Sequence, residues 1–265
     1  MERLGTDEQT LQKYLQVGKM SGVITDEIVS RFKTKIESIQ RKHPERADYE
    51  ILSSLIFRKS FFKTQFYKFF KKDLIRQKKF NRNVDEIINS GFMTGCTDYA
   101  MVYSALARKL GIPATFLSTA ERTSVEKSDG KQRFYGHAFC EVFDKKTNSW
   151  VLIDPTYNVV QKNYDPNSFS LHHSVYGSRD YIPFLRDLDP SLVFDGVDPS
   201  KRSQRYIQSN IELANKELAD PGKATVYPLP KDKTETIKSK KVRRSNTNER
   251  TKRLGQDNQV GIVKQ

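Results

Sequence analysis

The sequence GCTDYAMVYSALARKLGIPA, residues 95–114, joins a cysteine to the start of a helix. Cys96 follows Gly95, and apolar residues then recur at helical spacing until Gly111 and Pro113, which end the helix. Backbone N–H groups at a helix N-terminus have no intrahelical partner, and the helix dipole favours an anion there. This position therefore predicts a lowered thiol pKa and a nucleophilic role for Cys96.

Two later segments predict a β-hairpin. FYGHAFCEVFD alternates so that His137 shares a face with Phe139, while Cys140 points to the opposite face as core packing. DKKTNS forms the turn, and WVLIDPT is a strand that Pro155 ends. If facing residue numbers add up to 291, His137 lies opposite Asp154; if they add up to 293, the two are diagonal neighbours on the same face. Either register holds an imidazole beside a carboxylate.

These three residue types are those of a Cys–His–Asp triad. Cys96 would supply the thiolate and, through its backbone N–H, a donor for the oxyanion. His137 would take the thiol proton and later give it to the leaving amine, while Asp154 would orient the imidazole. No ligand pair has the short spacing common in zinc sites, and we expect neither a metal nor a cofactor.

The segments GCTDYAMVYSALARKLGIPA, GHAFCEVFD and WVLIDPTYN, in this order, resemble the catalytic core of the transglutaminase-like superfamily. The resemblance covers residues 85–195. It implies an α+β, papain-like fold in which the helix that bears the nucleophile packs on an antiparallel sheet. Matched motif by motif, Cys96 corresponds to the nucleophile, His137 to the general base and Asp154 to the orienting acid.

One feature departs from that family. Transglutaminases proper use a tryptophan upstream of the cysteine as an oxyanion donor, whereas the only tryptophan here is Trp150. Its absence upstream weighs against cross-linking more than against amide hydrolysis. The amide side chains that could replace it are Gln65, Gln77, Asn81, Asn83 and Asn89.

The chain is predicted to have three parts. Residues 1–85 form a helical region packed on the core, with a capping box between Thr6 and Gln9 and a second helix that starts at Thr25. Residues 86–222 form the catalytic core, with a strand at 114–121, then loops from residue 165 and a final helix from Gln204 to Leu218. Residues 223–265 are polar, basic and without periodicity, as in a disordered tail.

Charge is distributed unevenly. The net charge of +14 divides into +7 for residues 1–95, −1 for 96–195, 0 for 196–222 and +8 for 223–265. The two basic flanks could attract an acidic partner or an anionic surface. No aromatic residue interleaves with the basic run KSKKVRRS, so we do not expect nucleic-acid binding.

The first residues lack an apolar signal-peptide region, and no apolar run is long enough to span a bilayer. Two cysteines make no disulfide framework. The expected location is therefore cytoplasmic.

Several other polar residues have simpler interpretations. Asp98, in the first helical turn, favours the helix dipole and opposes thiol ionisation, so it is assigned a structural role. Glu141 is a weaker candidate for positioning the site. His43, His172 and His173 have no partner at a suggestive spacing and are taken as surface or packing residues.

The function predicted from the sequence is cysteine-dependent acyl transfer on amide bonds of a protein or peptide, through a thioacyl intermediate. Hydrolysis, by a protease or amidase, is favoured. Two alternatives stay open: a protein transglutaminase with an amine acceptor, and a non-catalytic transglutaminase-like interaction module that binds through its basic flanks.

Overall fold

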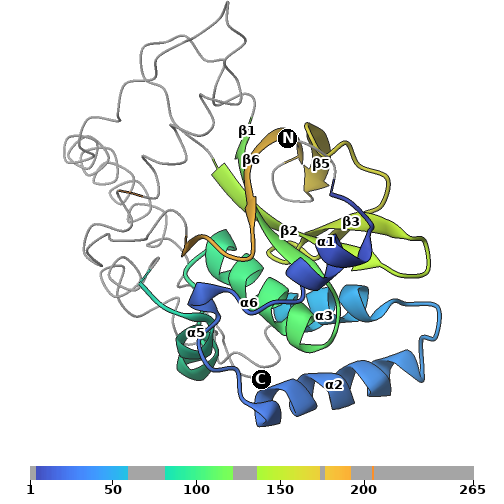
Figure 1. Cartoon of the computed structure of the whole chain (residues 1–265), viewed down its shortest axis with the longest axis vertical. Coiled ribbons are helices and arrows are strands. Elements are labelled where there is room, and N and C mark those ends of the chain that lie inside the picture. Colours follow the sequence, from blue (N-terminus) through green and yellow to red (C-terminus); the bar gives the residue numbers. More distant parts are fainter. Residues whose placement is uncertain (1–3, 59–80, 122–135, 174–176, 192–204, 206–265) are drawn as a thin grey trace, which may run out of the picture. The chain divides into compact units, whose positions relative to one another are not determined.

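The structure, a computed structural model, describes residues 4–58, 81–121, 136–173, 177–191 and 205 (Figure 1). Most helices come first along the chain, and the strands follow the helix that begins at Cys96. The elements are α1 (Glu8–Lys13), η1 (Lys19–Ser21), α2 (Asp26–Gln40), α3 (Asp48–Phe57), α5 (Val84–Ser90), α6 (Cys96–Lys109), β1 (Ala114–Glu121), β2 (Gly136–Asp144), β3 (Ser149–Asp154), β4 (Val159–Gln161), β5 (Phe169–His173) and β6 (Gly177–Asp187).

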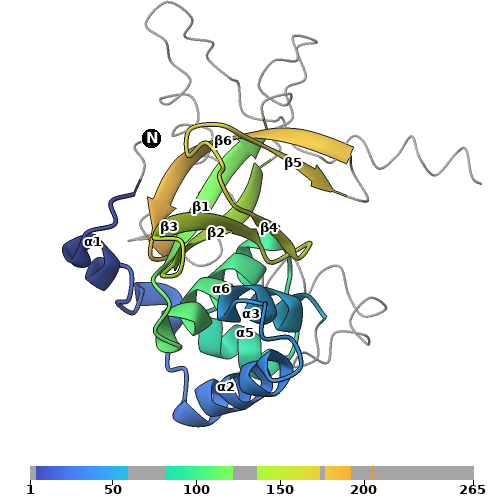
Figure 2. The ribbon, with the colours of Figure 1, turned by 90° about the vertical axis from the view of Figure 1, so that its right-hand side faces the viewer.

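The strands form one six-stranded sheet in the order β4-β3-β2-β1-β6-β5, and every neighbouring pair is antiparallel. Figure 2 shows α2, α3, α5 and α6 together on one side of this sheet. Helix α6 packs directly on β1 and β2. The predicted α+β architecture, with the cysteine-bearing helix on an antiparallel sheet, is confirmed.

Helix α6 is buried on nearly all sides, unlike an ordinary surface helix with one apolar stripe. It ends as the sequence predicts, because Gly111 adopts a φ of 78° that residues with a side chain rarely take. The N–H of Ile112 then donates to the carbonyl of Ala107 at 2.9 Å, which satisfies one of the last helical carbonyls. The chain enters β1 directly after this helix end.

Apolar side chains pack on both faces of the sheet. The larger cluster lies between the sheet and the helices and includes Cys140, while the smaller one, on the other face, includes Phe139. The predicted alternation of β2 is therefore confirmed. Cys140 is fully buried, and its thiol donates to the carbonyl of Ala100 in α6 at 3.2 Å.

The hairpin register is the second of the two considered. Cys140 faces Ile153 and Phe143 faces Trp150, so facing residue numbers add up to 293 and the register of 291 is wrong. His137 and Asp154 are consequently diagonal neighbours. Diagonal neighbours lie further apart than directly opposite residues, and the imidazole side chain is long enough to span this larger distance.

The N-terminal helices agree with prediction in part. Thr25 caps α2, accepting from the N–H of Ile28 at 3.4 Å. The predicted Thr6–Gln9 capping box is wrong, because the cap of α1 is Asp7, whose carboxylate accepts both the N–H and the hydroxyl of Thr10 at 2.9 and 2.7 Å. A carboxylate at a helix N-terminus makes stronger, charge-assisted bonds than a threonine hydroxyl.

Strands β5 and β6 were expected to be loops, and this expectation is wrong. β6 contains Pro183, which cannot donate a ladder hydrogen bond and argues against a central strand. The register between β1 and β6 shifts at Ser118 and Thr119, where Pro183 is accommodated beside an irregularity in the ladder. The predicted helix at 204–218, the basic tail and most of the phenylalanine-rich segment after Phe57 lie outside the described residues, and the three-part division stays a prediction.

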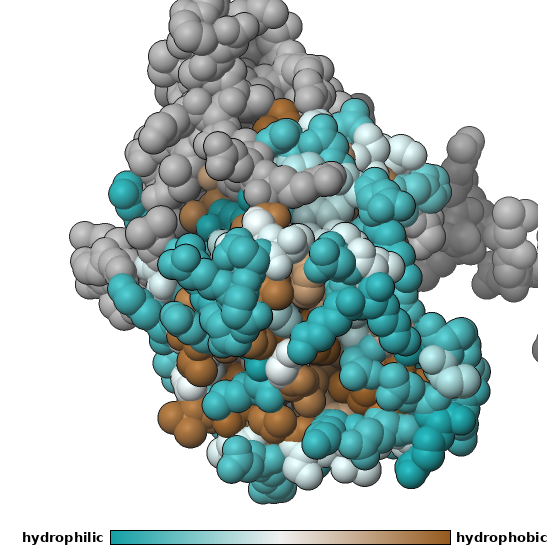
Figure 3. Space-filling model, turned by 45° about the vertical axis from the view of Figure 1, so that its right-hand side comes forward, coloured by the Kyte–Doolittle hydropathy of each residue, from teal (hydrophilic) through white to brown (hydrophobic). Residues whose placement is uncertain are grey.

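Few large apolar side chains are exposed in the part of the chain that the structure describes; they are Val17, Val23 and Phe57. In Figure 3, hydrophilic residues dominate the visible surface, and apolar atoms show between them mainly in the lower half of the view. None of the described helices has the length and apolarity needed to cross a membrane.

Cys140 offers a test of the packing of α6 on β2. Cys140→Ala removes a buried sulfur and its bond to Ala100, and we expect the free energy of unfolding to fall by about 1 to 2 kcal/mol. Because Cys140 lies on the helix-facing side of β2, alkylation of Cys96 by iodoacetamide should stay unchanged. Urea unfolding and mass spectrometry measure the two quantities, and a folded variant with an unreactive Cys96 would contradict this placement.

Candidate active site

Cys96 is the first residue of α6, and its partly exposed thiol is not in a disulfide. The preceding residue, Gly95, is extended rather than left-handed, so its backbone alone does not demand glycine. A Cβ added at Gly95 would meet no heavy atom of the described chain within 4 Å. The structure thus places the Cys96 thiol at a helix N-terminus, the position expected of a nucleophile.

His137 lies at the start of β2 and bonds through Nε2 to Oδ2 of Asp154, at the end of β3, over 2.9 Å. The side chain of His137 is 12% exposed and that of Asp154 fully buried. His137 also bonds to the thiol of Cys96. Since Nε2 is engaged with Asp154, Nδ1 is the ring nitrogen for the thiol. The three predicted residues are brought together.

The electrostatics of His137 favour its protonated form. Burial lowers its pKa, but the negative charge of the Cys96 thiolate and the hydrogen bonds with Asp154 and Cys96 outweigh burial and raise the pKa from 6.5 to about 10. Cys140 behaves oppositely, because burial raises the pKa of its thiol well above the ordinary value. Of the two cysteines, only Cys96 lies beside a group that can hold its proton.

Asp154 also organises the turn that follows β3. Its Oδ1 accepts the N–H groups of Thr156 and Tyr157 at 2.9 and 3.3 Å. This turn stacks Tyr157 on the His137 ring, with centroids 5.7 Å apart and planes 26° from parallel. Phe139 meets the same ring edge-on at 4.6 Å. Aromatic contacts on the face and edge of the imidazole restrict its rotation between its two hydrogen-bond partners.

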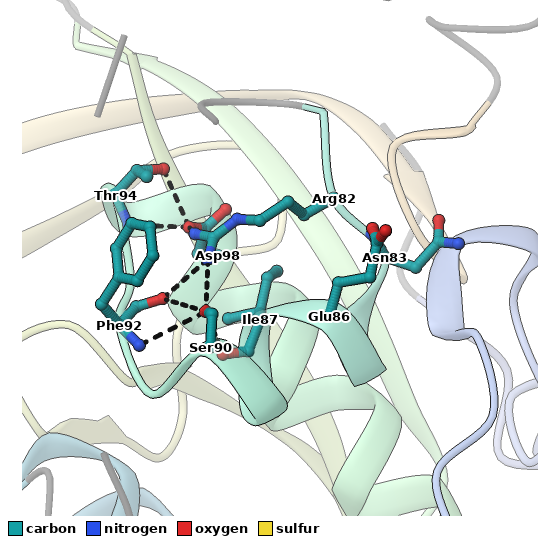
Figure 4. A network of polar contacts seen from close by, with 8 residues as sticks. All are labelled: Arg82, Asn83, Glu86, Ile87, Ser90, Phe92, Thr94 and Asp98. Carbon is teal, nitrogen blue, oxygen red and sulfur yellow. Dashed lines mark hydrogen bonds and ion pairs between the residues drawn. The ribbon is translucent and has the colours of Figure 1, made fainter. Parts of the chain in front are cut away.

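The loop before Cys96 is held by buried polar contacts (Figure 4). The guanidinium of Arg82 pairs with Oδ2 of Asp98 at 2.6 Å, and its other terminal nitrogen donates to the carbonyl of Phe92 at 3.0 Å and to Ser90 at 2.7 Å. Asp98 Oδ2 also accepts the N–H and hydroxyl of Thr94 at 2.7 and 2.8 Å. These bonds tie α5, the loop and the first turn of α6 together.

Glu141 shares a strand face with His137 but bonds to other partners. Its carboxylate accepts two bonds from Arg186, at 2.6 and 2.8 Å, one from Thr115 at 3.1 Å, and a further one from the hydroxyl of Tyr164. The carboxylate is fully buried and joins β1, β2 and β6. These contacts make Glu141 a structural anchor of the sheet rather than a partner of the imidazole.

The oxyanion donors are placed only in part. The backbone N–H of Cys96 lies at the helix start, where it is suited to this task. Trp150 donates its indole N–H to the carbonyl of Gly5 at 2.9 Å and packs against Tyr14, so it is committed to the N-terminal segment. Among the amide candidates, Asn83 and Asn89 are exposed on or beside α5, Asn81 is partly buried, and Gln65 and Gln77 lie outside the described residues.

The remaining histidines lie at the surface where their side chains are described. His43 lies 3.5 Å from Glu45 in an exposed pair, and exposed His172 bonds to Ser178 at 3.1 Å. Within the described ranges, no group of three His, Cys, Asp or Glu side chains could hold a metal ion.

Sequence reasoning missed two residues of this site. Tyr157 stands inside the quoted motif WVLIDPTYN, so its closeness to Asp154 along the chain was a usable signal. Arg82 gave no such signal. Its partner Asp98 is sixteen positions away, and nothing in the local pattern distinguishes it from the many other basic residues of the N-terminal part.

Part of the chain is similar to known proteins. Residues 62–155 match the family model described as the transglutaminase-like superfamily, which confirms the resemblance and supports a cysteine-dependent enzyme in general. A solved structure described as "a Putative Cysteine Protease from Cytophaga hutchinsonii" is similar at 14% identity and a TM-score of 0.41. That match covers 70% of this chain and 49% of the other, so the chain spans about half of its length. The comparison with curated proteins finds no match.

The stack of Tyr157 on His137 generates a prediction. Tyr157→Leu keeps an apolar side chain but removes the ring face that holds and stabilises the imidazolium, and cation–π contacts of this kind contribute about 0.5 to 2 kcal/mol. We expect alkylation of Cys96 at pH 6 to slow by about threefold to tenfold. Tyr157→Phe keeps the ring and should react like the wild type. Equal rates for the leucine and phenylalanine variants would contradict a role for the ring.

Proposed function

We propose that this chain cleaves amide bonds of a protein or peptide by cysteine-dependent acyl transfer, with water as the final acceptor. The observation that carries the proposal is the placement of His137, bonded to Asp154 through Nε2 and to the thiol of Cys96 at a helix N-terminus. The transglutaminase-like match supports the class of enzyme. The reaction and its acceptor are argued from the site.

Acylation begins with the proton of Cys96 on Nδ1 of His137. The thiolate attacks the carbonyl carbon of the substrate, a C–S bond forms, and the oxyanion is stabilised by the backbone N–H of Cys96. The imidazolium then gives its proton to the amine, the C–N bond breaks, and a thioester remains on Cys96. Asp154 keeps the imidazole in the tautomer and orientation that this transfer needs.

Deacylation uses the same groups in the reverse sense. His137, now neutral, takes a proton from the incoming water as the water attacks the thioester carbon. The C–S bond breaks, the carboxylic acid leaves, and the proton returns to the thiolate–imidazole pair. An amine acceptor would follow the same steps. Water is favoured because the upstream tryptophan that stabilises the oxyanion in transglutaminases proper has no equivalent in this sequence, whose single tryptophan, Trp150, follows Cys96 and donates to the carbonyl of Gly5.

The pH dependence of Cys96 tests the ion pair. Since the pKa of His137 is raised to about 10, the imidazolium accompanies the thiolate through neutral pH. Alkylation at pH 6 should exceed that of an ordinary cysteine by at least about tenfold, because a free thiol is almost wholly protonated there. Cys140, buried and with a raised pKa, serves as an internal control in the same mass spectrum. If Cys96 reacts no faster at pH 6 than an ordinary free cysteine, there is no activated thiolate.

A second experiment tests the chemistry and its acceptor. Wild type and Cys96→Ala are incubated with a peptide library, quenched in acid and searched for acylated Cys96 by mass spectrometry. The wild type should carry a thioester and release acids, and Cys96→Ala should do neither. Asp154→Asn should slow acylation by about 10⁴-fold, as in serine proteases with the equivalent change. Products that appear only when a primary amine is added would reject water as acceptor and support transamidation.

A further inference from the structure

The buried pair of Arg82 and Asp98 lies next to the proposed nucleophile in the fold. Asp98 is two residues after Cys96, and its carboxylate bonds to the N–H of Thr94, two residues before it. The Asp98 carboxylate therefore connects the residues on either side of Cys96 by its bonds to Thr94 (Figure 4). Arg82 and Asp98 are only 5% and 3% exposed, so water screens their charges poorly.

Asp98 alone would hinder the chemistry of Cys96. A carboxylate in the first helical turn cancels part of the positive end of the helix dipole and repels a thiolate close by. Arg82 supplies the opposite charge at 2.6 Å, and its guanidinium also lies over the ring of Phe92, 4.2 Å from the centroid. The cation is thus fixed in place by the same loop that it supports.

From this geometry we infer that Arg82 and Asp98 are positioning residues that hold the nucleophile loop while contributing no net charge to it. The two hydrogen bonds from Thr94 to Asp98 fix the backbone around Gly95. The guanidinium neutralises the carboxylate that makes those bonds. The helix N-terminus is then left to stabilise the thiolate of Cys96. This inference rests on the proposed function of Cys96 as a nucleophile.

Other charges around the thiol do not alter this argument. The pKa of Asp98 is raised above its ordinary value, because burial outweighs the lowering by Arg82 and by the Thr94 donors. Of the contacts that favour the ionised carboxylate, the charge of Arg82 is the largest. Tyr99 stays neutral, because burial and the charge of Asp98 raise its pKa to about 12. Among the described residues, Cys96 and Asp154 act on His137, whose ring also contacts Tyr157 and Tyr181. Asp98 pairs with Arg82 and raises the pKa of Tyr99.

The test uses two variants that break the same ion pair from opposite sides. Asp98→Asn leaves the cation unbalanced and should lower the pH midpoint of Cys96 alkylation by about half a unit to one unit. Arg82→Gln leaves the carboxylate unbalanced and should raise it by a similar amount. A purely structural role predicts the same direction for both, because both variants loosen the same loop. The inference predicts that the pH midpoint of alkylation rises from Asp98→Asn through the wild type to Arg82→Gln. Any other order overturns the inference.

Further variants serve as controls. Thr94→Val removes one hydrogen bond to Asp98 without changing charge, and Arg82→Lys keeps the charge but not the fork of donors; both should keep the wild-type midpoint. Breaking one side of a buried pair is strongly destabilising, so circular dichroism must first show that each variant folds. If a single variant does not fold, Arg82→Met combined with Asp98→Asn removes both charges. It should restore the wild-type midpoint, and a shifted midpoint overturns the inference.

The two proposals fail in different ways. The reactivity of wild-type Cys96 at pH 6 judges the proposed function, whereas the order of the midpoints among the variants judges the role of Arg82 and Asp98. That order can be determined wherever the wild-type midpoint lies. An ordinary thiol in the wild type would therefore reject the enzyme without concealing the result for the ion pair.

Discussion

The bonds of the Asp154 carboxylate organise the whole site. One oxygen accepts from His137, and the other accepts the two N–H groups of the turn that carries Tyr157. A fully buried carboxylate is costly unless it is paired and hydrogen-bonded, and these contacts meet that requirement. The same bonds that make the burial of Asp154 tolerable also orient His137: one holds Nε2 of the ring, and the others position Tyr157 against the ring face. The contacts that stabilise the end of β3 are therefore also those that orient the proposed base.

Strand β2 connects the Asp154–His137 pair to the helix that carries Cys96, the proposed nucleophile. β2 places His137 at its open end and Cys140 against α6, so one strand fixes both the base and the position of the helix that carries Cys96. Helix α6 is enclosed on nearly all sides, so it has little freedom to slide relative to the sheet. Strand and helix hold the two reacting groups at a fixed separation through packing, with no metal or disulfide involved in the described contacts.

Short-range patterns were sufficient to predict the centre of the fold. Gly111 and Pro113 mark the end of α6, the alternation in GHAFCEVFD separates the two faces of β2, and β1 spans the predicted residues 114–121. Where two local solutions compete, the sequence is ambiguous. The hairpin allowed two registers that preserve the same faces, and the cap of α1 is Asp7 rather than the predicted neighbour Thr6. Side-chain reach decides the register and hydrogen-bond strength decides the cap, and the periodicity of the sequence carries information on neither.

Long-range pairing accounts for what could not be predicted. β6 joins the sheet next to β1, from which it is separated by the whole hairpin, and its Pro183 gives a local signal against a strand. Arg82 pairs with Asp98 across a helix and a loop. An isolated acidic residue beside a nucleophile looks unfavourable from sequence, because its effect on the thiolate depends on a cation that only the fold brings near. At this site Asp154 pairs with His137 and Asp98 pairs with Arg82, so each of these two buried carboxylates has one cation beside it. With both carboxylates matched, the helix N-terminus and the proton on His137 are the two influences left to act on Cys96, which is what its proposed nucleophilic role requires.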